Sequence, residues 1–556
     1  MQEIDEYPEP TQADWEELVE SSDKLPASAY LVILIEFCER FTYYGLSGPF
    51  QNYIQYPNPE SYPAEQPGAL GRGQQTATAL TTFFTFFCYF TPIIAGVIAD
   101  QYLGKYKTIL YSSYIYFVGL LFLTFSSIPP VLSTSAAFPL FVISLILIGC
   151  GTGGIKSNVS PLVAEQYKSK KPYVKTLENG KRVIITPQAT IQKIFLLFYW
   201  GINVGGLSAI ATTSLEKFVG FWPAYLLPTL MFIIGICITL IGRNRYVQTP
   251  PRGSVFLETF KVISVAIRHG RRLEAAKPSE LLKIDPTLAA RATWDDVFVD
   301  EIRRTLRACI IFCWFPIFWL CYSQMTNNLI SMTGTMQTGN VPNDILQNIN
   351  PFALIICIPI MDQLVYPFFR RIKHPLRPIR RIYIGFFVAA CAMAYAAGIQ
   401  SYVYKQPPYF DHPEGRKNNV SVALAIPAFV LIAISEIFAS VTGLEYAYKK
   451  APQSMKSLVM SLFLFTNCCA SILNFALVTV AKDPKLPWLY TGIAGTAFVC
   501  SILIWFLHRK RDESDVADDA IVRNTDEQLE YATRDDKQVP HIADLKAVTD
   551  EEAVRH

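Results

Sequence analysis

The stretch EFCERFTYYG, residues 36–45, places two glutamates and an arginine inside an apolar segment that runs over residues 28–50. About 20 mostly apolar residues are needed for a helix to cross the hydrocarbon core of a bilayer, and this segment is long enough. On a helix, Glu36, Glu39 and Arg40 occupy positions i, i+3 and i+4, so they lie on one face. The stretch therefore predicts a membrane helix that carries a charged cluster along one side.

The rest of the chain repeats this apolar pattern. Of its 556 residues, 51% are hydrophobic and only 17% are charged, which is a composition typical of membrane proteins. Backbone groups in lipid must be hydrogen-bonded within the protein, and the apolar stretches do not alternate as barrel strands do. We therefore predict an all-α integral membrane protein with twelve transmembrane helices. The predicted spans are residues 28–50, 76–99, 108–127, 138–160, 190–213, 221–242, 308–327, 350–369, 382–400, 420–448, 457–480 and 488–507.

The loops between these spans indicate the orientation of the chain. When they are assigned alternately to the two sides, with both termini inside, the inner loops carry 34 Lys and Arg residues and the outer loops carry 7. Basic residues are retained on the cytoplasmic side of a membrane, and a miscounted span would destroy the alternation. The distribution favours twelve spans with cytoplasmic N- and C-termini.

The spans fall into two groups of six. We predict an N-terminal bundle over residues 28–242 and a C-terminal bundle over residues 308–511, joined by a cytoplasmic linker over residues 243–307. Acidic cytoplasmic tails, read as mobile, are expected over residues 1–27 and 512–556. Two helical bundles around a central site are typical of transporters that work by alternating access.

The linker contains a segment with helical periodicity. Its apolar residues Phe256, Phe260, Ile263 and Ile267 share one face opposite a basic face. This pattern predicts an amphipathic helix that lies on the membrane surface or against the bundle, either as a structural strut or as a regulatory element.

Other features restrict the class of protein. Residues 1–27 hold nine acidic side chains and one lysine, unlike the basic start of a cleaved signal peptide, so we expect the first span to be retained. All twelve cysteines fall within predicted spans, so no disulfide framework is expected. Asn419 begins a glycosylation sequon beside a span, and its use is left open. The net charge of +3 indicates no nucleic-acid partner, because topology already explains where the basic residues lie.

The cluster in the first span indicates function. An ionisable group at bilayer depth costs about 2.5–3.5 kcal/mol on the insertion scale, so such groups are expected to line a cavity. A salt bridge that only packs helices would need one carboxylate, whereas Glu36 and Glu39 share the single guanidinium of Arg40. The excess negative charge predicts that this pair binds a proton.

Further charged residues lie in other spans. Lys156 lies near the inner end of the fourth span, either at the site or reaching to the cytoplasm. Glu436 lies in the middle of the tenth span, far in sequence from any other charge, which makes it the strongest functional candidate in the second half. Asp362 and Glu445 lie nearer the cytoplasmic ends of their spans, and we expect them to act in gating or packing.

Several motifs together resemble a known family. EFCERFTYYG, AGVIADQYLGKYKTI (95–109), GTGGIK (151–156), FYWGINVGGL (198–207) and SEIFASVTGLEYAY (435–448) resemble the signatures of the proton-coupled oligopeptide transporter family. SQMTNNLIS (323–331) and the acidic tails resemble its fungal branch. The resemblance implies the major facilitator fold and import of di- and tripeptides together with protons.

The resemblance also implies roles for matching positions. Arg40 and Lys156 would meet the peptide carboxylate, and Glu436 would meet the peptide amino terminus. Asp100, in the signature over 95–109, is given a gating or structural role. Six further residues match cavity positions of the family: Tyr43, Tyr44, Tyr89, Asn203, Trp319 and Asn350.

The sequence departs from the family pattern at two places. Thr82 stands where animal members carry a histidine, and all six histidines of this chain lie in loops, at a span end or in the tail, so carboxylates must carry the proton. Ser47 and Ser323 stand where many members carry a basic and an acidic residue that pair. The outer gate is therefore expected to close by packing and neutral hydrogen bonds.

Other functions were weighed against this one. A nitrate or other anion symporter of the same family would need a cationic cavity, and Glu436 argues against it. A peptide receptor without transport is not excluded by the sequence. The loops carry no nucleotide loop, metal-ligand cluster or nucleophile elbow, so an enzyme is not expected. Expected partners are di- and tripeptides, protons and the lipid bilayer, and no cofactor is expected beyond the coupling proton. The fungal resemblance implies the plasma membrane. The oligomeric state stays open.

Overall fold

The computed structural model describes residues 8, 10–11, 14–15, 18–168, 172–176, 180–251, 253, 255–269, 272–339, 341–372, 376–410, 417–450 and 455–509. The predicted C-terminal tail over residues 512–556 lies outside these residues. So does the side chain of Asp362, a predicted gating residue.

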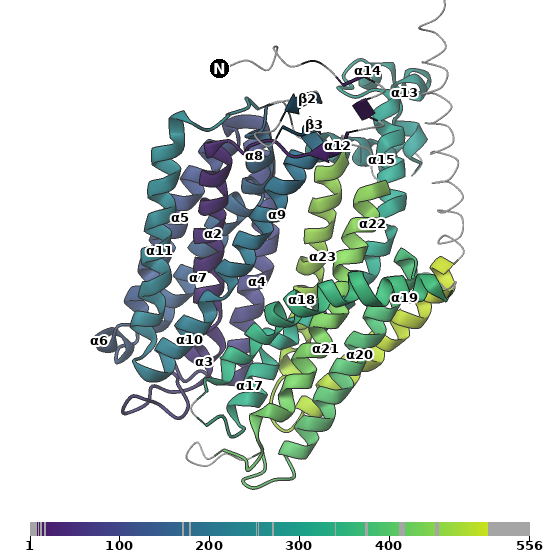
Figure 1. The fold of residues 1–556 in the computed structure, drawn as a ribbon. Coiled ribbons are helices and arrows are strands. Elements are labelled where there is room, and N and C mark those ends of the chain that lie inside the picture. The colour runs from purple at the N-terminus through teal and green to yellow at the C-terminus, as the bar shows by residue number, and fades with distance from the viewer. Residues whose placement is uncertain are drawn as a thin grey trace, which may run out of the picture.

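Long helices lie side by side in two groups, which we call the first and the second half (Figure 1). The first half contains α2 (Ala27–Ser47), α3 (Phe50–Gln55), α4 (Gly73–Ile98), α5 (Lys105–Ser126), α6 (Pro129–Leu132), α7 (Ala137–Lys156), α8 (Val159–Glu165), α9 (Pro187–Gly206), α10 (Ser208–Phe218) and α11 (Phe221–Ile241). The second half contains α16 (Phe315–Ser323), α17 (Asn328–Gly334), α18 (Ile349–Ile360), α19 (Tyr366–Arg371), α20 (Pro378–Val403), α21 (Ile426–Glu436), α22 (Thr442–Lys450), α23 (Lys456–Leu477) and a last helix over Leu486–Arg509.

Within the described residues, eleven helices are long and apolar enough to cross a membrane. The helix α2, with 21 residues, is not one of these eleven, although it lies beside them in space. The charged side chains of Glu36, Glu39 and Arg40 reduce its mean hydropathy. The predicted helical membrane architecture is confirmed, and the chain is a multi-pass membrane protein. Two points stay predictions: α2 completes a set of twelve spans, and both termini are cytoplasmic.

Each half has its own apolar core. One core draws on buried residues between Ala29 and Tyr246, and the other on residues between Cys309 and Ile504. Each core buries aromatic side chains on several helices, such as Phe141 in the first half and Phe386 in the second. The described cysteines are free, in line with the expectation of no disulfide framework.

The predicted outer loops are more structured than the sequence indicated. We expected loops over residues 51–75, 214–220 and 328–349, but α3, α10 and α17 extend into them. Glu216 and Lys217, expected in a loop, are only 0% and 4% exposed. Residues between the predicted spans are thus helical and buried here, because polar side chains from both halves pack against one another. These elements lie at the bottom of Figure 1, which we call the far end.

The linker forms a small helical layer at the opposite end, which we call the linker end (Figure 1). It contains α12 (Val255–Arg268), α13 (Pro278–Ile284), α14 (Pro286–Ala289) and α15 (Asp296–Cys309). The amphipathic helix was predicted correctly, but its buried face was not. Phe260 and Ile267 are 64% and 62% exposed, whereas Val262 and Ala266 are buried, because α12 packs against the 3-10 turn Leu273–Ala276 and α23 through smaller side chains.

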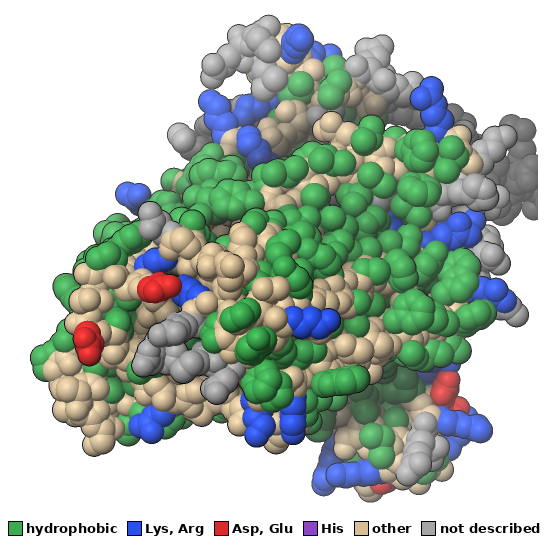
Figure 2. All heavy atoms as spheres, turned by 90° about the horizontal axis from the view of Figure 1, so that it is seen from below, with side chains coloured by type: hydrophobic (Ala, Val, Ile, Leu, Met, Phe, Trp, Pro, Cys, Tyr) green, Lys and Arg blue, Asp and Glu red, His purple; other side chains and the backbone are tan. Residues whose placement is uncertain are grey.

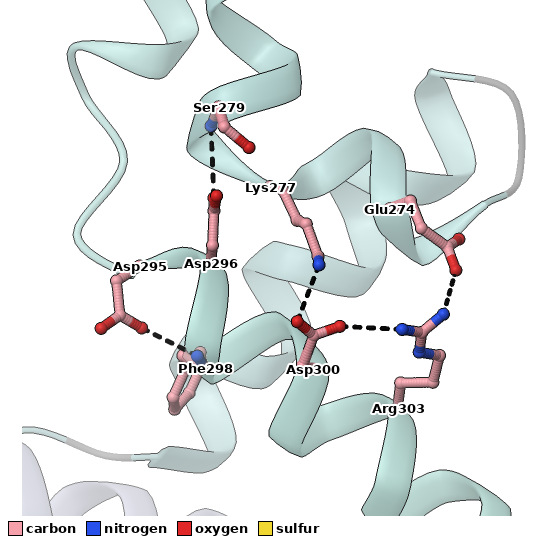
Figure 3. Close-up of polar contacts among 8 residues, drawn as sticks. All are labelled: Glu274, Lys277, Ser279, Asp295, Asp296, Phe298, Asp300 and Arg303. Atoms are coloured by element: carbon pink, nitrogen blue, oxygen red, sulfur yellow. Dashed lines mark hydrogen bonds and ion pairs between the residues drawn. The ribbon is translucent and has the colours of Figure 1, made fainter.

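Polar contacts hold this layer together (Figure 3). The Asp300 carboxylate on α15 accepts hydrogen bonds from Lys277 Nζ at 2.7 Å and from Arg303 Nη2 at 2.9 Å. Arg303 also pairs with Glu274, and the Asp295 side chain caps the start of α15 by accepting from Phe298 N at 2.8 Å. These contacts tie the segment that contains Glu274 and Lys277 to α15, the last helix of the linker.

A small sheet adds to the helical fold at the linker end. Its strands β1 (Glu20–Ser21), β3 (Arg182–Ile185) and β2 (Tyr173–Thr176) lie in that order, with β1 parallel to β3. The Asp23 carboxylate accepts from Tyr173 Oη at 2.8 Å; burial opposes its charge, yet this and other hydrogen bonds lower the pKa of Asp23. The expectation that residues 1–27 form only a mobile tail is therefore wrong for the part that pairs with β3.

Candidate substrate and proton site

The charged cluster predicted on the first span is present on α2. Arg40 Nε lies 2.9 Å from Glu36 Oε1 and 2.7 Å from Glu39 Oε2. The three residues are 6%, 4% and 1% exposed. Neither carboxylate is aligned with the N–H bond of Arg40, and both Glu39 oxygens lack a hydrogen-bond partner within the described residues. Two buried carboxylates thus face one nitrogen, an arrangement that can accept a proton or release the guanidinium.

Glycines on α9 set the position of this cluster. A Cβ atom on Gly205 would lie 2.9 Å from Arg40 Cβ and 2.9 Å from Phe41 N, which is closer than such atoms approach. The absence of a side chain at Gly205 therefore allows α9 to pack directly on α2 beside Arg40. This close approach explains Gly205 of the FYWGINVGGL stretch.

Lys156 lies at the end of α7, on the side of the first half that also carries the α2 cluster. We call this side of the site the first wall. Its Nζ atom lies 3.6 Å from the centre of the Tyr89 ring on α4, which is a cation–π contact. Gly151 and Gly153 contact Tyr116 and Thr91 so closely that a Cβ atom would clash with them. GTGGIK is thus a helix-packing motif, and Lys156 at its end contacts the Tyr89 ring of α4.

Two tyrosines extend the wall along α2. The Tyr43 ring lies 5.6 Å from Arg40 Cζ and is stacked 5.9 Å from the Phe84 ring. The Tyr44 ring meets Tyr43 edge-on at 5.4 Å, and Tyr44 is 38% exposed. Tyr43 therefore supports the guanidinium from one side, while Tyr44 offers a free aromatic surface.

The second half contributes a different wall. Glu436 ends α21, immediately before the π-helical turn Ile437–Val441, and its Oε2 accepts a hydrogen bond from Asn350 Nδ2 at 3.1 Å. Asn350 Nδ2 also donates to Tyr322 Oη at 3.0 Å. The carboxylate of Glu436 is thus held by a neutral amide, which leaves its charge available to a cationic ligand.

Trp319 lies beside this group. Its indole Nε1 donates to Thr466 Oγ1 at 3.0 Å, and its ring meets Tyr322 edge-on at 5.4 Å. Trp319 is only 8% exposed, so it packs against Tyr322 and has little surface left to contact a ligand.

The two walls are close to one another. Tyr44 and Tyr89 of the first half interact electrostatically with Glu436 of the second half. Tyr199 on α9 does so too, and the Asn203 amide donates to the Tyr199 carbonyl at 2.8 Å. Aromatic side chains of the first half therefore lie within electrostatic range of the carboxylate of the second half.

The predicted gating residues lie elsewhere. Asp100 occupies the π-helical turn Ala99–Leu103 at the linker end and lines a cavity of about 110 Å³ beside the Lys105–Glu165 ion pair. Glu445 is exposed on α22. Ser47 ends α2, and the Ser323 hydroxyl donates to the Leu320 carbonyl at 2.9 Å.

Sequence reasoning missed Tyr322 and the polar contacts that join the halves at the far end. Gln51 Nε2 donates to Ser331 Oγ at 2.9 Å, Thr78 Oγ1 to Asn328 Oδ1 at 3.1 Å, and Asn474 Nδ2 to Thr82 Oγ1 at 2.8 Å. These groups are neutral, but Glu216, Lys217 and Asp344 are buried at the same end, so neutral contacts do not account for the whole interface. The high share of Asn and Gln in SQMTNNLIS was the available signal, because uncharged amides pair well when buried.

Comparison with known proteins identifies the family. Residues 106–491 match the family model described as the POT family. The chain belongs to the POT family. This agrees with the motif resemblance stated above and with the fold.

Relatives in fungi cover most of the chain. It is 48% identical over 503 residues to the probable peptide transporter ptr2 of Schizosaccharomyces pombe, covering 90% of this chain and 81% of the relative. It is 44% identical over 515 residues to the peptide transporter PTR2 of Saccharomyces cerevisiae, covering 92% and 84%. Both POT relatives are named as transporters, which agrees with the prediction that this chain is not an enzyme.

A solved structure shares the fold. The crystal structure of an auto-inhibited POT family peptide transporter superimposes with a TM-score of 0.68 at 23% identity, over 87% of this chain and 97% of the other. This likeness supports the predicted major facilitator architecture for this POT family member.

Proposed function

We propose that this POT family protein is a proton-coupled symporter that imports di- and tripeptides by alternating access. The observation that carries the proposal is the division of charge between the halves: Arg40 and Lys156 border the site on one side and Glu436 on the other. A zwitterionic peptide presents the complementary charges at its two ends. The relatives named as peptide transporters support the same substrate class.

In this proposal the peptide carboxylate binds Arg40 and Lys156, and the amino terminus binds Glu436. A chain extends by about 3.3–3.6 Å per residue, so clamping both ends selects two or three residues without reading the side chains. The rings of Tyr44 and Tyr89 offer aromatic surface that accepts varied side chains.

The coupling proton binds the Glu36/Glu39 pair. With Arg40, Lys156 and Glu436, these groups sum to one negative charge, and a zwitterionic peptide adds none, so one proton makes the loaded site neutral. A neutral site is less costly to enclose in a medium of low dielectric. Protonation frees the Arg40 guanidinium for the peptide carboxylate, and loss of the proton inside lets a glutamate compete for Arg40 and displace the peptide.

The far end is taken as the outer end, and the neutral hydrogen bonds there form the outer gate. A structure with this gate closed corresponds to the stage at which peptide leaves toward the cytoplasm. The plasma membrane is the proposed location, following the fungal relatives.

Two other functions make different demands on the site. Glu436 would weaken anion binding in an anion symporter, because a buried carboxylate held by Asn350 repels an anion. A peptide receptor without transport would bind peptide but accumulate none.

Uptake of a labelled dipeptide tests the proposal. The chain is expressed in cells without their own peptide carrier, and uptake is measured at external pH 5.5 and 7.5, with and without a protonophore. We expect accumulation at pH 5.5 that the protonophore abolishes. Binding without accumulation would favour the receptor, and uptake that is insensitive to pH and protonophore would contradict proton coupling.

A further inference from the structure

A second pair of carboxyl groups lies at the far end, outside the site described above. Glu216 of α10 and Asp344 of the 3-10 turn Asn343–Asn348 belong to different halves, and both are 0% exposed. The Asn343–Asn348 turn packs against α10, and the Asn52 amide bridges Glu216 to Asn343, the residue before Asp344, so the two carboxyl groups are neighbours. This pair therefore joins the halves at the proposed outer gate, close to α3 and α17 at the bottom of Figure 1.

The hydrogen bonds around the pair leave most of its oxygens without a donor. The amide of Asn52 donates to Glu216 Oε1 at 2.8 Å and to Asn343 Oδ1 at 2.9 Å. Glu216 Oε2 and both oxygens of Asp344 have no donor within the described residues. Two carboxyl oxygens form a hydrogen bond with each other only when one of them carries a proton, because two ionised carboxylates in contact repel.

The nearest cation does not replace that proton. Lys217 Nζ is directed away from the pair and donates to the carbonyls of Gly339 at 2.9 Å and Val341 at 3.0 Å. It interacts with Asp344 only electrostatically. One shared proton leaves the pair with a single negative charge, which Lys217 balances, so the singly protonated state is the neutral one.

Other titratable groups around the pair support this assignment. Tyr225 of α11 interacts electrostatically with both carboxyls, and its hydroxyl is fully buried without a partner within the described residues. Tyr62 interacts with Glu216 from the loop after α3. Lys417 and Glu65 lie beyond Lys217 and interact with each other, so they add no net charge. Acidic side chains are sparse on the far-end surface seen in Figure 2.

We propose that Glu216 and Asp344 share one proton that latches the outer gate shut. When the halves separate at this end, both carboxyls meet water and ionise, so the proton returns to the side from which it came. It is therefore a gating proton and is not carried across with the peptide. External acid favours the closed gate, and the ratio of closed to open molecules rises by up to about tenfold per pH unit for one proton.

Distances between spin labels test the latch without any peptide, so the result is independent of the transported substrate. Labels are attached through encoded ketone side chains at Ser135, exposed after α6, and Tyr402, 47% exposed near the end of α20. In the full chain in lipid nanodiscs, we expect a short distance at pH 5 and a growing longer population at pH 8.

Conservative variants identify the groups responsible. Glu216→Gln and Asp344→Asn each supply an amide donor to the remaining carboxylate, so the gate is expected to stay closed at both pH values. Glu60→Gln, an exposed carboxylate in the loop after α3, is the matched control and should respond as the wild type does. At pH 5, the infrared absorption of protonated carboxyl groups should fall by one group in either variant and stay at the wild-type level in the control.

The proposal is overturned if the wild type shows no change with pH, or if both variants keep the wild-type response. The two variants change residues in opposite halves. If one variant fails to fold, the pH response of the other still tests the proposal. A pH response that persists in both would assign gating to the carboxylates of the central site.

Discussion

The two walls of the central site hold their charges in different ways. On the first half, Glu36, Glu39 and Arg40 are crowded within hydrogen-bonding distance, and the Glu39 oxygens remain without a donor. On the second half, Glu436 is a single charge held by the neutral amide of Asn350. The first wall has two carboxylates that compete for one guanidinium, whereas the second wall has one carboxylate that a neutral amide holds in place.

In the proposed mechanism, this difference gives coupling to the first half and orientation of the peptide to the second. Two carboxylates crowded around one guanidinium can each bind the same proton. Such a pair can switch between two charge states. A lone carboxylate with a neutral donor offers a constant electrostatic contact, which suits recognition of an amino terminus. The predictions below test this division, starting with the largest effect.

Replacing Glu39 by Gln is expected to remove the switch. For one proton and a difference of two pH units, the wild type can accumulate a zwitterionic dipeptide up to about a hundredfold. The variant should only equilibrate it, to a ratio of about one, while exchange of labelled for unlabelled peptide continues. The internal-to-external ratio of a hydrolysis-resistant dipeptide measures the effect, and Glu60→Gln in an exposed loop is the control. Accumulation by Glu39→Gln at the wild-type level would contradict the assignment.

Replacing Glu436 by Ala is expected to remove the fixed contact. A hydrogen bond to a charged group contributes about 1.5–3 kcal/mol, so affinity for peptides with a free amino terminus should fall roughly ten- to a hundredfold. N-acetylated peptides should lose far less. Competition against a labelled dipeptide measures both, and equal losses for blocked and free peptides would remove Glu436 from this role.

Replacing Asn350 by Leu is expected to have a smaller effect, because the carboxylate remains but loses its neutral donor. The loss of about 0.5–1.5 kcal/mol corresponds to a two- to tenfold lower affinity. Tyr322→Phe, which removes only the hydroxyl that accepts from Asn350, serves as the control and should change affinity less. The same competition assay applies, and a control that loses more than Asn350→Leu would show that Tyr322 is the more important support.

Replacing Tyr89 by Leu tests the contact that holds Lys156 against the first wall. Loss of a cation–π interaction of about 0.5–1 kcal/mol should weaken peptide binding two- to fivefold. Tyr89→Phe keeps the ring and should bind almost as the wild type does. Peptide methyl esters, which lack the carboxylate, should be unaffected by Tyr89→Leu; an equal loss for esters would mean that the ring contacts the peptide itself.

Much of the site was predictable because charge is costly in a membrane. Glu36, Glu39, Arg40 and Glu436 stood out in apolar stretches, and the structure brings them to one region from helices far apart in the chain. Tyr322 was not predictable, because an aromatic residue in a membrane span is common and gives no signal on its own. The buried face of α12 was also missed, because small residues and not the large apolar ones fill that contact.

The sequence by itself determined the membrane helices, their expected orientation and the presence of buried charges, because hydrophobicity and the cost of ionisation act locally along the chain. Only the tertiary structure decided which polar residues meet across the halves. Glu216 and Asp344, 128 positions apart, were ordinary loop residues until the far end closed around them. A shared proton depends on contact between groups, and contact between distant segments is set by packing.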